Sequence, residues 1–168
     1  MTRHMVVVEP GGGRPLSLGR DMFVLGGAAL TAGAYSVLDQ VVAPRLIVPP
    51  HLHERETQVA LVLSGRLGFW VDGEVAEVGA GGYVLRPAGH AHALWNPTDA
   101  PARMLELTSP GAAFEEYMAA ASALMDRGEA TPQSIGALAE PYGIRFVDGP
   151  LAELCERYGV SPTGGFWK

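Results

Sequence analysis

Histidines are the residues in this 168-residue sequence whose spacing points most clearly to chemistry. Four of the five fall in two pairs, His51 with His53 and His90 with His92. Residues two positions apart on a β-strand point to the same face, so each pair can turn both imidazoles toward one interior. Imidazole nitrogens suit zinc, iron, nickel and copper. A lone histidine is more often a structural residue, but two such pairs together favour a metal site.

The residues around both pairs follow a regular spacing. His51 and His53 are followed by Gln58, and six residues separate Gln58 from Gly65. The second pair lies in a segment with five spaced positions, which are Gly81, Pro87, Gly89, His92 and Asn96. This spacing resembles the cupin superfamily, whose motifs read G-x5-H-x-H-x3–4-E-x6-G and G-x5-P-x-G-x2-H-x3-N. The second motif is matched at every fixed position, whereas the first departs at Arg45, where glycine is usual, and at Gln58, where glutamate is usual.

The flanking sequence is similar to that of quercetinase-like single-domain cupins of actinomycete type, in segments 23–26, 48–53 and 141–147. The resemblance implies an all-β fold, a cupin jelly-roll β-sandwich or barrel with a short C-terminal helical extension, and a homodimer. It also implies one divalent transition metal, which is Fe, Mn, Ni, Cu or Zn. The implied metal ligands are His51, His53, Gln58 and His92. Because cupins carry many reactions on one scaffold, the motifs do not fix the reaction.

A glutamine at position 58 changes what such a site can do. The Gln58 amide oxygen is a weak ligand, but it cannot act as a base near neutral pH. A neutral ligand set leaves the metal charge uncompensated, which favours the binding and acidification of an enol or phenol. Glu56 is a candidate catalytic base if its turn delivers it inward, and a solvated turn is the alternative. His90 is a candidate fourth histidine, as in the zinc-containing cupin cyclases of aromatic polyketide pathways, and a position on the rim is the alternative.

Strand alternation suggests what surrounds the metal. If Gln58 faces the interior, Ala60 and Val62 do too, which gives an apolar wall. Five large side chains are candidates for contacting a substrate, although each is individually more typical of ordinary core; they are Tyr35, Phe69, Leu94, Trp95 and Met104. Together they predict a pocket for a hydrophobic small molecule. Arg86 is the nearest candidate for a clamp on a substrate carboxylate, although a surface position at a strand end is the favoured interpretation.

Two parts of the chain must position these residues. Residues 1–110 are short runs of aliphatic and aromatic residues broken by turns, which is typical of a sandwich or barrel. The predicted strands are Met5–Val8, Met22–Leu25, Ala34–Val42, Arg45–Pro49, Thr57–Leu63, Leu67–Val71, Glu74–Val78, Tyr83–Arg86, His92–Trp95 and Ala102–Thr108. The dipeptide Asp72-Gly73 predicts a hairpin turn. Residues 111–168 are predicted to be a helical extension that packs on the barrel or at a dimer interface. Its predicted elements are helices at Phe114–Asp126, Pro132–Ala139 and Pro150–Tyr158 and a loose tail at Ser161–Lys168.

Composition excludes several classes of function. The formal net charge of −6 argues against nucleic acid or an anionic membrane surface as the main partner, because both reward clustered positive charge. Lys168 is the only lysine, which excludes a Schiff-base lysine and a phosphate-loop lysine within the fold. Cys155 is the only cysteine, which excludes an internal disulfide and a cysteine metal cluster. With no long apolar run, the chain is expected to be cytoplasmic.

The sequence therefore favours a metal-dependent cupin enzyme that acts on a hydrophobic enol or aromatic small molecule. The first hypothesis is a quercetinase-like dioxygenase, an oxidoreductase. The second is a non-redox metal-dependent cyclase or isomerase of polyketide or other secondary metabolism, which Gln58 and the pair of His90 with His92 favour. The third is a cupin that binds a small molecule without turnover.

Overall fold

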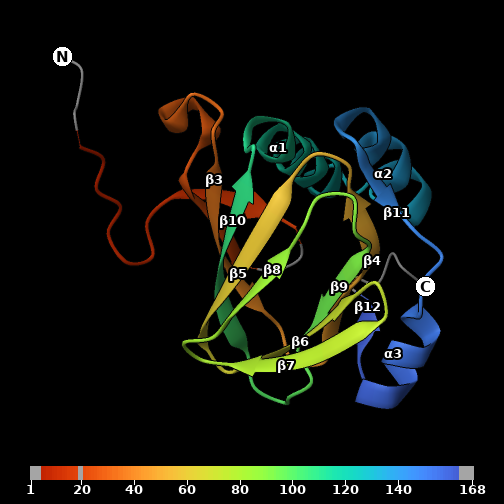
Figure 1. Ribbon diagram of the computed structural model, residues 1–168. Helices are drawn as coiled ribbons and strands as arrows, with labels where there is room; N and C mark the ends of the chain where they lie inside the picture. The colour runs from red at the N-terminus through yellow and green to blue at the C-terminus, as the bar shows by residue number, and fades with distance from the viewer. Residues whose placement is uncertain (1–4, 19–20, 163–168) are drawn as a thin grey trace.

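The strands of the computed structural model, which describes residues 5–18 and 21–162, form two facing sheets (Figure 1). The first sheet has the order β1-β2-β3-β10-β5-β8 and the second the order β11-β4-β9-β6-β7, with β12 pairing β4. The strands of the first sheet are β1 (Arg14–Ser17), β2 (Asp21–Gly26), β3 (Ser36–Val42), β10 (Ala102–Ser109), β5 (Thr57–Ser64) and β8 (Tyr83–Arg86). Those of the second are β11 (Ile144–Phe146), β4 (Leu46–His53), β9 (His92–Trp95), β6 (Arg66–Val71), β7 (Glu74–Gly79) and β12 (Ser161–Pro162). The expected jelly-roll sandwich is confirmed.

The alternation of inward and outward residues explains why these segments pair as they do. On β5, Gln58, Ala60 and Val62 are all buried, as the sequence predicted. The hairpin between β6 and β7 turns at Asp72 and Gly73, whose φ angles of 44° and 97° are both positive. A tight turn with two positive φ angles matches the twist of the flanking strands, so this hairpin signal is also confirmed.

Strand β4, which carries the first histidine pair, extends beyond its predicted end at Pro49. Its pairing with β9 is interrupted between Val48 and His51, so Pro49 and Pro50 lie where the ladder of hydrogen bonds is broken. Proline has no N–H to donate and is tolerated in a strand at such a place. The irregularity lets β4 continue to His53 and keeps both histidines on a strand.

One predicted strand is absent from the structure, and short strands that were not predicted are present. Met5–Val8 forms no strand and is an exposed extended segment, because it pairs with no described neighbour. The first strand is instead β1, which begins at Arg14. It was not predicted, because it has only four residues and one of them is a proline. The strand β11 was also missed, since three residues give too short a pattern.

The residues after position 110 form three α-helices, which are α1 (Ala112–Asp126), α2 (Pro132–Ala139) and α3 (Leu151–Tyr158). Two short 3-10 helices, η1 (Ala28–Thr31) and η2 (Glu140–Tyr142), complete the elements. Helices α1 and α2 lie together at one end of the sandwich, and α3 lies beside the second sheet (Figure 1). The extension also contributes β11 and β12 to the second sheet, so it is not only helical. Of the predicted loose tail, 163–168 lies outside the described residues.

Buried side chains form one cluster between the sheets and two under the helices. The cluster between the sheets includes Phe69 and Met104. A second cluster joins α1 and α2 to strands β1, β2 and β3, and a third joins α3 to β4 and β9. Within the described ranges, no helix has the length and apolar character needed to cross a membrane.

Candidate metal centre and pocket

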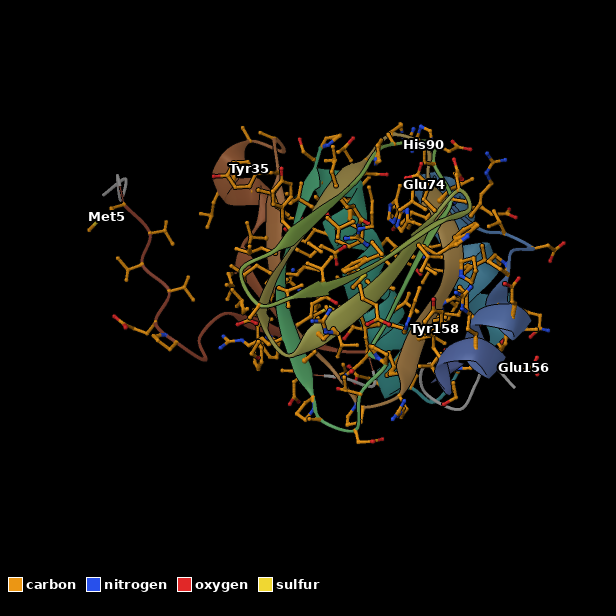
Figure 2. All side chains as sticks on the ribbon, turned by 60° about the horizontal axis from the view of Figure 1, so that its bottom comes forward. Met5, Tyr35, Glu74, His90, Glu156 and Tyr158 are labelled. Carbon is orange, nitrogen blue, oxygen red and sulfur yellow. The ribbon has the colours of Figure 1, made fainter. Side chains whose placement is uncertain are left out.

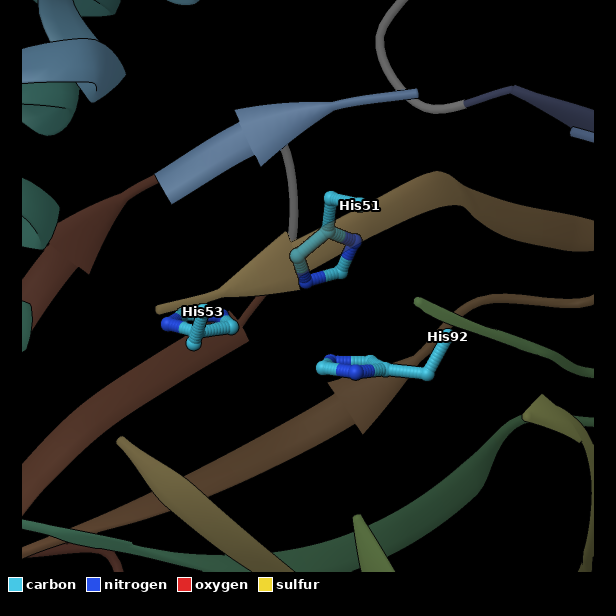
Figure 3. A group of neighbouring side chains, drawn as sticks. All are labelled: His51, His53 and His92. Atoms are coloured by element: carbon cyan, nitrogen blue, oxygen red, sulfur yellow. The ribbon is translucent and has the colours of Figure 1, made fainter. Parts of the chain in front are cut away.

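Three histidines from two neighbouring strands meet inside the sandwich (Figure 3). Strand β4 supplies His51 and His53, and β9 supplies His92, which pairs directly with His51 in the sheet. The ring centroid of His51 lies 5.2 Å from that of His53 and 4.5 Å from that of His92. The candidate ligand nitrogens all lie within 4.8 Å of one another. The sequence prediction that these three imidazoles share one interior agrees with this geometry.

Each Nδ1 of the three histidines faces an oxygen atom. Nδ1 of His51 lies 2.8 Å from the carbonyl oxygen of Pro49, and Nδ1 of His92 lies 3.1 Å from that of His90. Because a carbonyl oxygen can only accept, an Nδ1–H on each ring satisfies these contacts and leaves Nε2 with a free lone pair. Metal-binding histidines are commonly held in this way by their second nitrogen.

Burial keeps the imidazoles neutral. Burial, followed by the nearby His53, lowers the pKa of His51 to about 3. Burial and then the neighbouring His51 lower the pKa of His92 well below its usual range. Neutral imidazole is the form that coordinates a metal, so neither ring has to lose a proton near neutral pH.

Gln58 on β5 lies next to His92. Its side-chain Oε1 is 3.2 Å from Nε2 of His92, and its Nε2 donates to Oγ1 of Thr108 at 3.3 Å. A neutral imidazole carries one N–H, so His92 can donate either to Gln58 or to the carbonyl of His90.

The separation of Gln58 Oε1 and His92 Nε2 is also that of two ligands of one metal ion. Two ligand atoms each about 2.1 Å from one ion lie about 3.0–3.4 Å apart for octahedral to tetrahedral angles, and the observed separation is 3.2 Å. The three imidazoles and the Gln58 oxygen are ligands of the kind that a divalent transition metal takes, and for the pair of His92 and Gln58 the spacing fits as well.

The turn places the Glu56 side chain in the interior, where it lies next to Nδ1 of His53 and not in the pocket. Its side chain is 1% exposed, and its Oε2 lies 3.5 Å from Nδ1 of His53. Neither carboxylate oxygen of Glu56 has a hydrogen-bond partner. The predicted role of catalytic base does not fit this position. The carboxylate is placed to orient His53 and to offset the charge of a bound metal.

A pocket of about 100 Å³ opens beside the histidines. One end is polar and is lined by His51, His53, Gln40, Arg86 and Glu106. The remaining wall is largely apolar and comes from β4, β9, α1, α2 and β11; it includes Leu94, Phe114, Met118, Ile135, Ile144 and Phe146. The C-terminal extension thus covers the entrance to the site.

The polar end contains a buried network that the sequence reading missed. Arg86 donates to Glu106, and Gln40 donates to the other oxygen of the same carboxylate. Arg86 is 1% exposed, so the expected surface position was wrong. It faces inward because β8 pairs with β5 with Arg86 opposite the inward-facing Gln58. Glu106 shares strand parity with Met104, which was a signal that it would also face inward.

His90 is not brought to the three histidines. It lies in the turn before β9, its side chain is 53% exposed, and its Nδ1 is 2.7 Å from Oδ2 of Asp72. The strand begins only at His92, and the turn at Gly89, with a φ of 80°, breaks the strand parity that the prediction relied on. This corrects the candidate catalytic role of His90.

The candidate substrate-contacting residues separate into three groups. Leu94 lines the pocket. Phe69 and Met104 are buried between the sheets, away from the pocket wall. Trp95 points to the other side of β9, where its ring lies 4.7 Å from that of Tyr158, and Tyr35 is 42% exposed just before β3. Trp95 and Tyr35 therefore do not contact the pocket.

Comparison with known proteins supports the fold. Residues 38–108 match the family described as a cupin domain, and no curated protein matches the sequence. A predicted oxalate decarboxylase from Thermotoga maritima has 20% identity over 62% of this chain and 98% of its own, with a TM-score of 0.56. A cupin 2 conserved barrel domain protein from Salinispora arenicola has 21% identity over 65% and 90%, with a TM-score of 0.51. KdgF from Halomonas sp. has 19% identity over 62% and 84%, with a TM-score of 0.50. Residues 38–108 are therefore similar to a cupin domain, and the chain has the cupin fold.

Proposed function

We propose that this protein is a metal-dependent enzyme that acts on a small apolar molecule carrying an enol or phenol oxygen, as a dioxygenase of quercetinase-like type. The observation that carries the proposal is the group of three close imidazoles, two of which, His51 and His53, line a pocket whose other polar side chains include Arg86, Glu106 and Gln40. An apolar wall binds the carbon skeleton, and the polar end fixes its oxygen.

His51, His53 and His92 would hold the metal, with the Gln58 oxygen as a further ligand. A bound divalent transition metal supplies Lewis acidity toward an enol or phenol oxygen and, if redox-active, access to oxygen chemistry. None of these four ligands would be anionic, and Glu56 behind His53 offsets only one of the two positive charges of the metal, so an anionic substrate oxygen would compensate the other. This preference for an oxyanion supports an enol or phenol substrate.

Glu106 is the group proposed to accept the substrate's hydroxyl proton. Among the described residues that line the pocket it is the one carboxylate. It lies on β10 opposite Ala60, two positions along β5 from Gln58, and so on the same inner face. Arg86 and Gln40 each hold one of its oxygens, which fixes the carboxylate toward the pocket. A positioned base within reach of the substrate is what proton removal requires.

The size of the pocket limits the substrate. Its volume of about 100 Å³ is below the roughly 150 Å³ of a protein cavity that holds benzene. A flavonol is larger than this volume, so the pocket as it stands would not enclose one. We propose a substrate with no more than one ring, or an acyclic enol such as a β-diketone.

A non-redox isomerase or cyclase is the second candidate. It is favoured by Gln58, which gives a site without an anionic ligand, and by Glu106, which can remove a proton and return it to another substrate atom. Such a reaction consumes no oxygen. The two candidates are therefore separated by whether turnover stops without oxygen.

The first experiment measures metal content by elemental analysis on protein purified without a metal-affinity column. We expect about one equivalent in the native protein and in the matched control His90→Ala, and none in the double variant His51→Ala/His92→Ala. The loaded protein is then assayed for consumption of acetylacetone and catechol, with and without oxygen. Loss of turnover without oxygen supports the dioxygenase, and unchanged turnover supports the isomerase. Protein that binds no metal after reconstitution contradicts both, and substrate binding without turnover identifies a binding cupin.

Glu106→Gln tests the proposed base separately. Removing a general base slows turnover by about 100-fold or more, while the amide oxygen can still accept from Arg86. We expect metal content to stay at the native level and turnover to fall. Native turnover in this variant would show that Glu106 is not the base.

A further inference from the structure

Arg86 and Gln40 each present one buried polar atom that has no hydrogen-bond partner in the described part of the chain. These atoms are Nε of Arg86 and Oε1 of Gln40. Each side chain is 1% exposed, and both line the pocket. Exposed polar groups such as His90 and Glu74, which lie at the surface in Figure 2, can bond to water instead. A buried donor or acceptor without a partner is costly, so the two atoms call for an explanation.

The carboxylate of Glu106 fixes which end of the Gln40 amide is left without a partner. Glu106 is paired with the guanidinium of Arg86, so its oxygens accept hydrogen bonds. The amide of Gln40 has to turn its NH2 group toward this carboxylate, which leaves its oxygen without a partner. The two side chains thus offer one acceptor, on Gln40, and one donor, on Arg86.

Strand pairing brings these two side chains together. Arg86 comes from β8 and Gln40 from β3, and they bond the two different oxygens of the Glu106 carboxylate on β10. Ala60 lies opposite Glu106 on β5, the strand between β8 and β10, and its small side chain leaves room for Arg86 to reach across. The unpaired donor and the unpaired acceptor therefore belong to one cluster around one carboxylate.

This cluster lies next to the candidate metal centre. Arg86 is opposite Gln58 in the sheet, and Oε1 of Gln58 lies 3.2 Å from Nε2 of His92. Two of the three clustered histidines line the same pocket as Arg86 and Gln40. A small ligand can therefore reach a metal with one group and the cluster with another.

The charges of the cluster decide which chemical group it can bind. Arg86 and Glu106 form an ion pair, so the cluster has no net charge. A carboxylate accepts from Arg86 but has no hydrogen to donate to Gln40, and Glu106 repels it. An ammonium group donates to Gln40 but cannot accept from Arg86. A hydroxyl group both donates and accepts, and it is small enough for a pocket of about 100 Å³.

We propose that Arg86 and Gln40 form a subsite that determines specificity and binds a second, un-ionised hydroxyl group of the substrate. This inference rests on the proposed function, because the first oxygen of the substrate is the one that binds the metal. Nε of Arg86 donates to the hydroxyl oxygen, and the hydroxyl group donates to Oε1 of Gln40. An analogue without this hydroxyl leaves both protein atoms buried and unpaired, and sites built to bond a hydroxyl reject such analogues for this reason.

The test compares ligands that differ only in this hydroxyl. Resorcinol is paired with 3-methylphenol and hydroquinone with 4-methylphenol, because a methyl group is close in size to a hydroxyl. A meta or para hydroxyl also cannot bind the same metal ion as the first. Isothermal titration calorimetry measures the four dissociation constants with the zinc-loaded protein. In at least one pair we expect the dihydroxy compound to bind about tenfold more tightly than its methyl partner. Ratios near one in both pairs overturn the subsite.

Two variants assign this preference to the two atoms. Arg86→Lys keeps a positive charge beside Glu106 but has no Nε, and Gln40→Met has no acceptor oxygen. We expect each to weaken the preferred dihydroxy compound by about tenfold, while its methyl partner binds as before. Arg103→Lys is the matched control, because Arg103 forms the same kind of pair with Asp39 on the other face of the sheet, and it should keep the wild-type ratio. A wild-type ratio in both Arg86→Lys and Gln40→Met overturns the proposal.

These titrations separate failure of the subsite from failure of the proposed function. If the loaded protein turns over a substrate but shows no preference for the second hydroxyl, the reaction stands and the subsite is overturned. If the protein takes up no metal, the proposed function fails, and titrations of the metal-free protein decide the subsite. Gln40→Met then weakens resorcinol or hydroquinone, and Arg103→Lys does not. Failure of all four compounds to bind the wild type overturns the subsite.

Discussion

At the scale of single residues, the carboxylate of the pocket lies on a different strand from the one on which the cupin motif would place it. Position 58, where cupin motifs usually carry glutamate, holds an amide, and the acidic group of the pocket is Glu106 on the neighbouring strand. In this arrangement, the side chain next to the histidines and the carboxylate of the pocket are two different residues. Gln58 faces the ligand nitrogen of His92, while Glu106, held by Arg86, faces the pocket.

Glu56→Gln is predicted to have opposite effects on stability and on metal binding. A buried carboxylate without a hydrogen bond is costly, so removing its charge should raise the Tm of the metal-free protein. The same change weakens the interaction of the side chain at position 56 with Nδ1 of His53, so it should lower metal affinity by about 10–100-fold. Thermal melts and competition with a chelating dye measure the two effects.

Glu54→Gln is the control for this change. Glu54 lies on the same turn, with its side chain 45% exposed and paired with Arg145. We expect native metal affinity in this control. If Glu56→Gln lowered both stability and affinity, or neither, the carboxylate would not be the orienting partner of His53.

At the scale of elements, close packing of strands depends on a glycine that the motifs do not include. Gly68 on β6 pairs with Trp95 on β9, and a Cβ at position 68 would lie 2.1 Å from Cε2 of Trp95. The indole lies across the backbone of β6 and is completely buried. It also packs against Tyr158 of α3, so β6, β9 and the C-terminal extension are held by one side chain.

Gly68→Ala is therefore predicted to destabilise the protein by about 3 kcal/mol, at the upper end for overpacking a core. Denaturation with urea measures this change. Gly136→Ala is the matched control, since a Cβ at Gly136 in α2 has no neighbour within 4 Å, and alanine in a helix should stabilise by about 0.5–1 kcal/mol. Equal stability of Gly68→Ala and wild type would mean that the indole can move without cost.

The sequence predicted the features that depend on local spacing and missed those that depend on how distant strands pair. Strands with alternating apolar residues and the three clustered histidines were found, because period and spacing are local properties. Arg86 was misplaced because the side it faces depends on pairing with β5, which is not local. His90 was placed by strand parity, which stopped at the turn at Gly89. Trp95 was assigned to the pocket because parity alone does not show which face of β9 the helix α3 covers.

At the scale of the whole molecule, metal binding and folding stability are linked. The candidate ligands come from β4, β5 and β9, which lie in both sheets, so a bound ion would hold the two layers together. A ligand at 100 times its dissociation constant stabilises the folded state by about 2.7 kcal/mol. For a chain of this size such a gain raises Tm by about 5–10 °C.

Removal of metal by a chelator is therefore predicted to lower Tm by about 5–10 °C, and returning the ion should restore it. Differential scanning calorimetry measures the change. The double variant His51→Ala/His92→Ala should melt at one temperature with or without metal. An identical Tm for loaded and metal-free native protein would contradict the predicted site.

The pairing of β11 with β4 has a consequence for the order in which the protein matures. Ile144, Arg145 and Phe146 lie opposite His53, Leu52 and His51, so the strand that carries two ligands gains its second neighbour from the last quarter of the chain. A ribosome makes residues 144–146 long after residues 51–53. Until residues 144–146 have been made, the end of β4 that carries His51 and His53 lacks the neighbour that β11 provides. If the site binds a metal, its complete surroundings therefore form only after these later residues have joined the sheet.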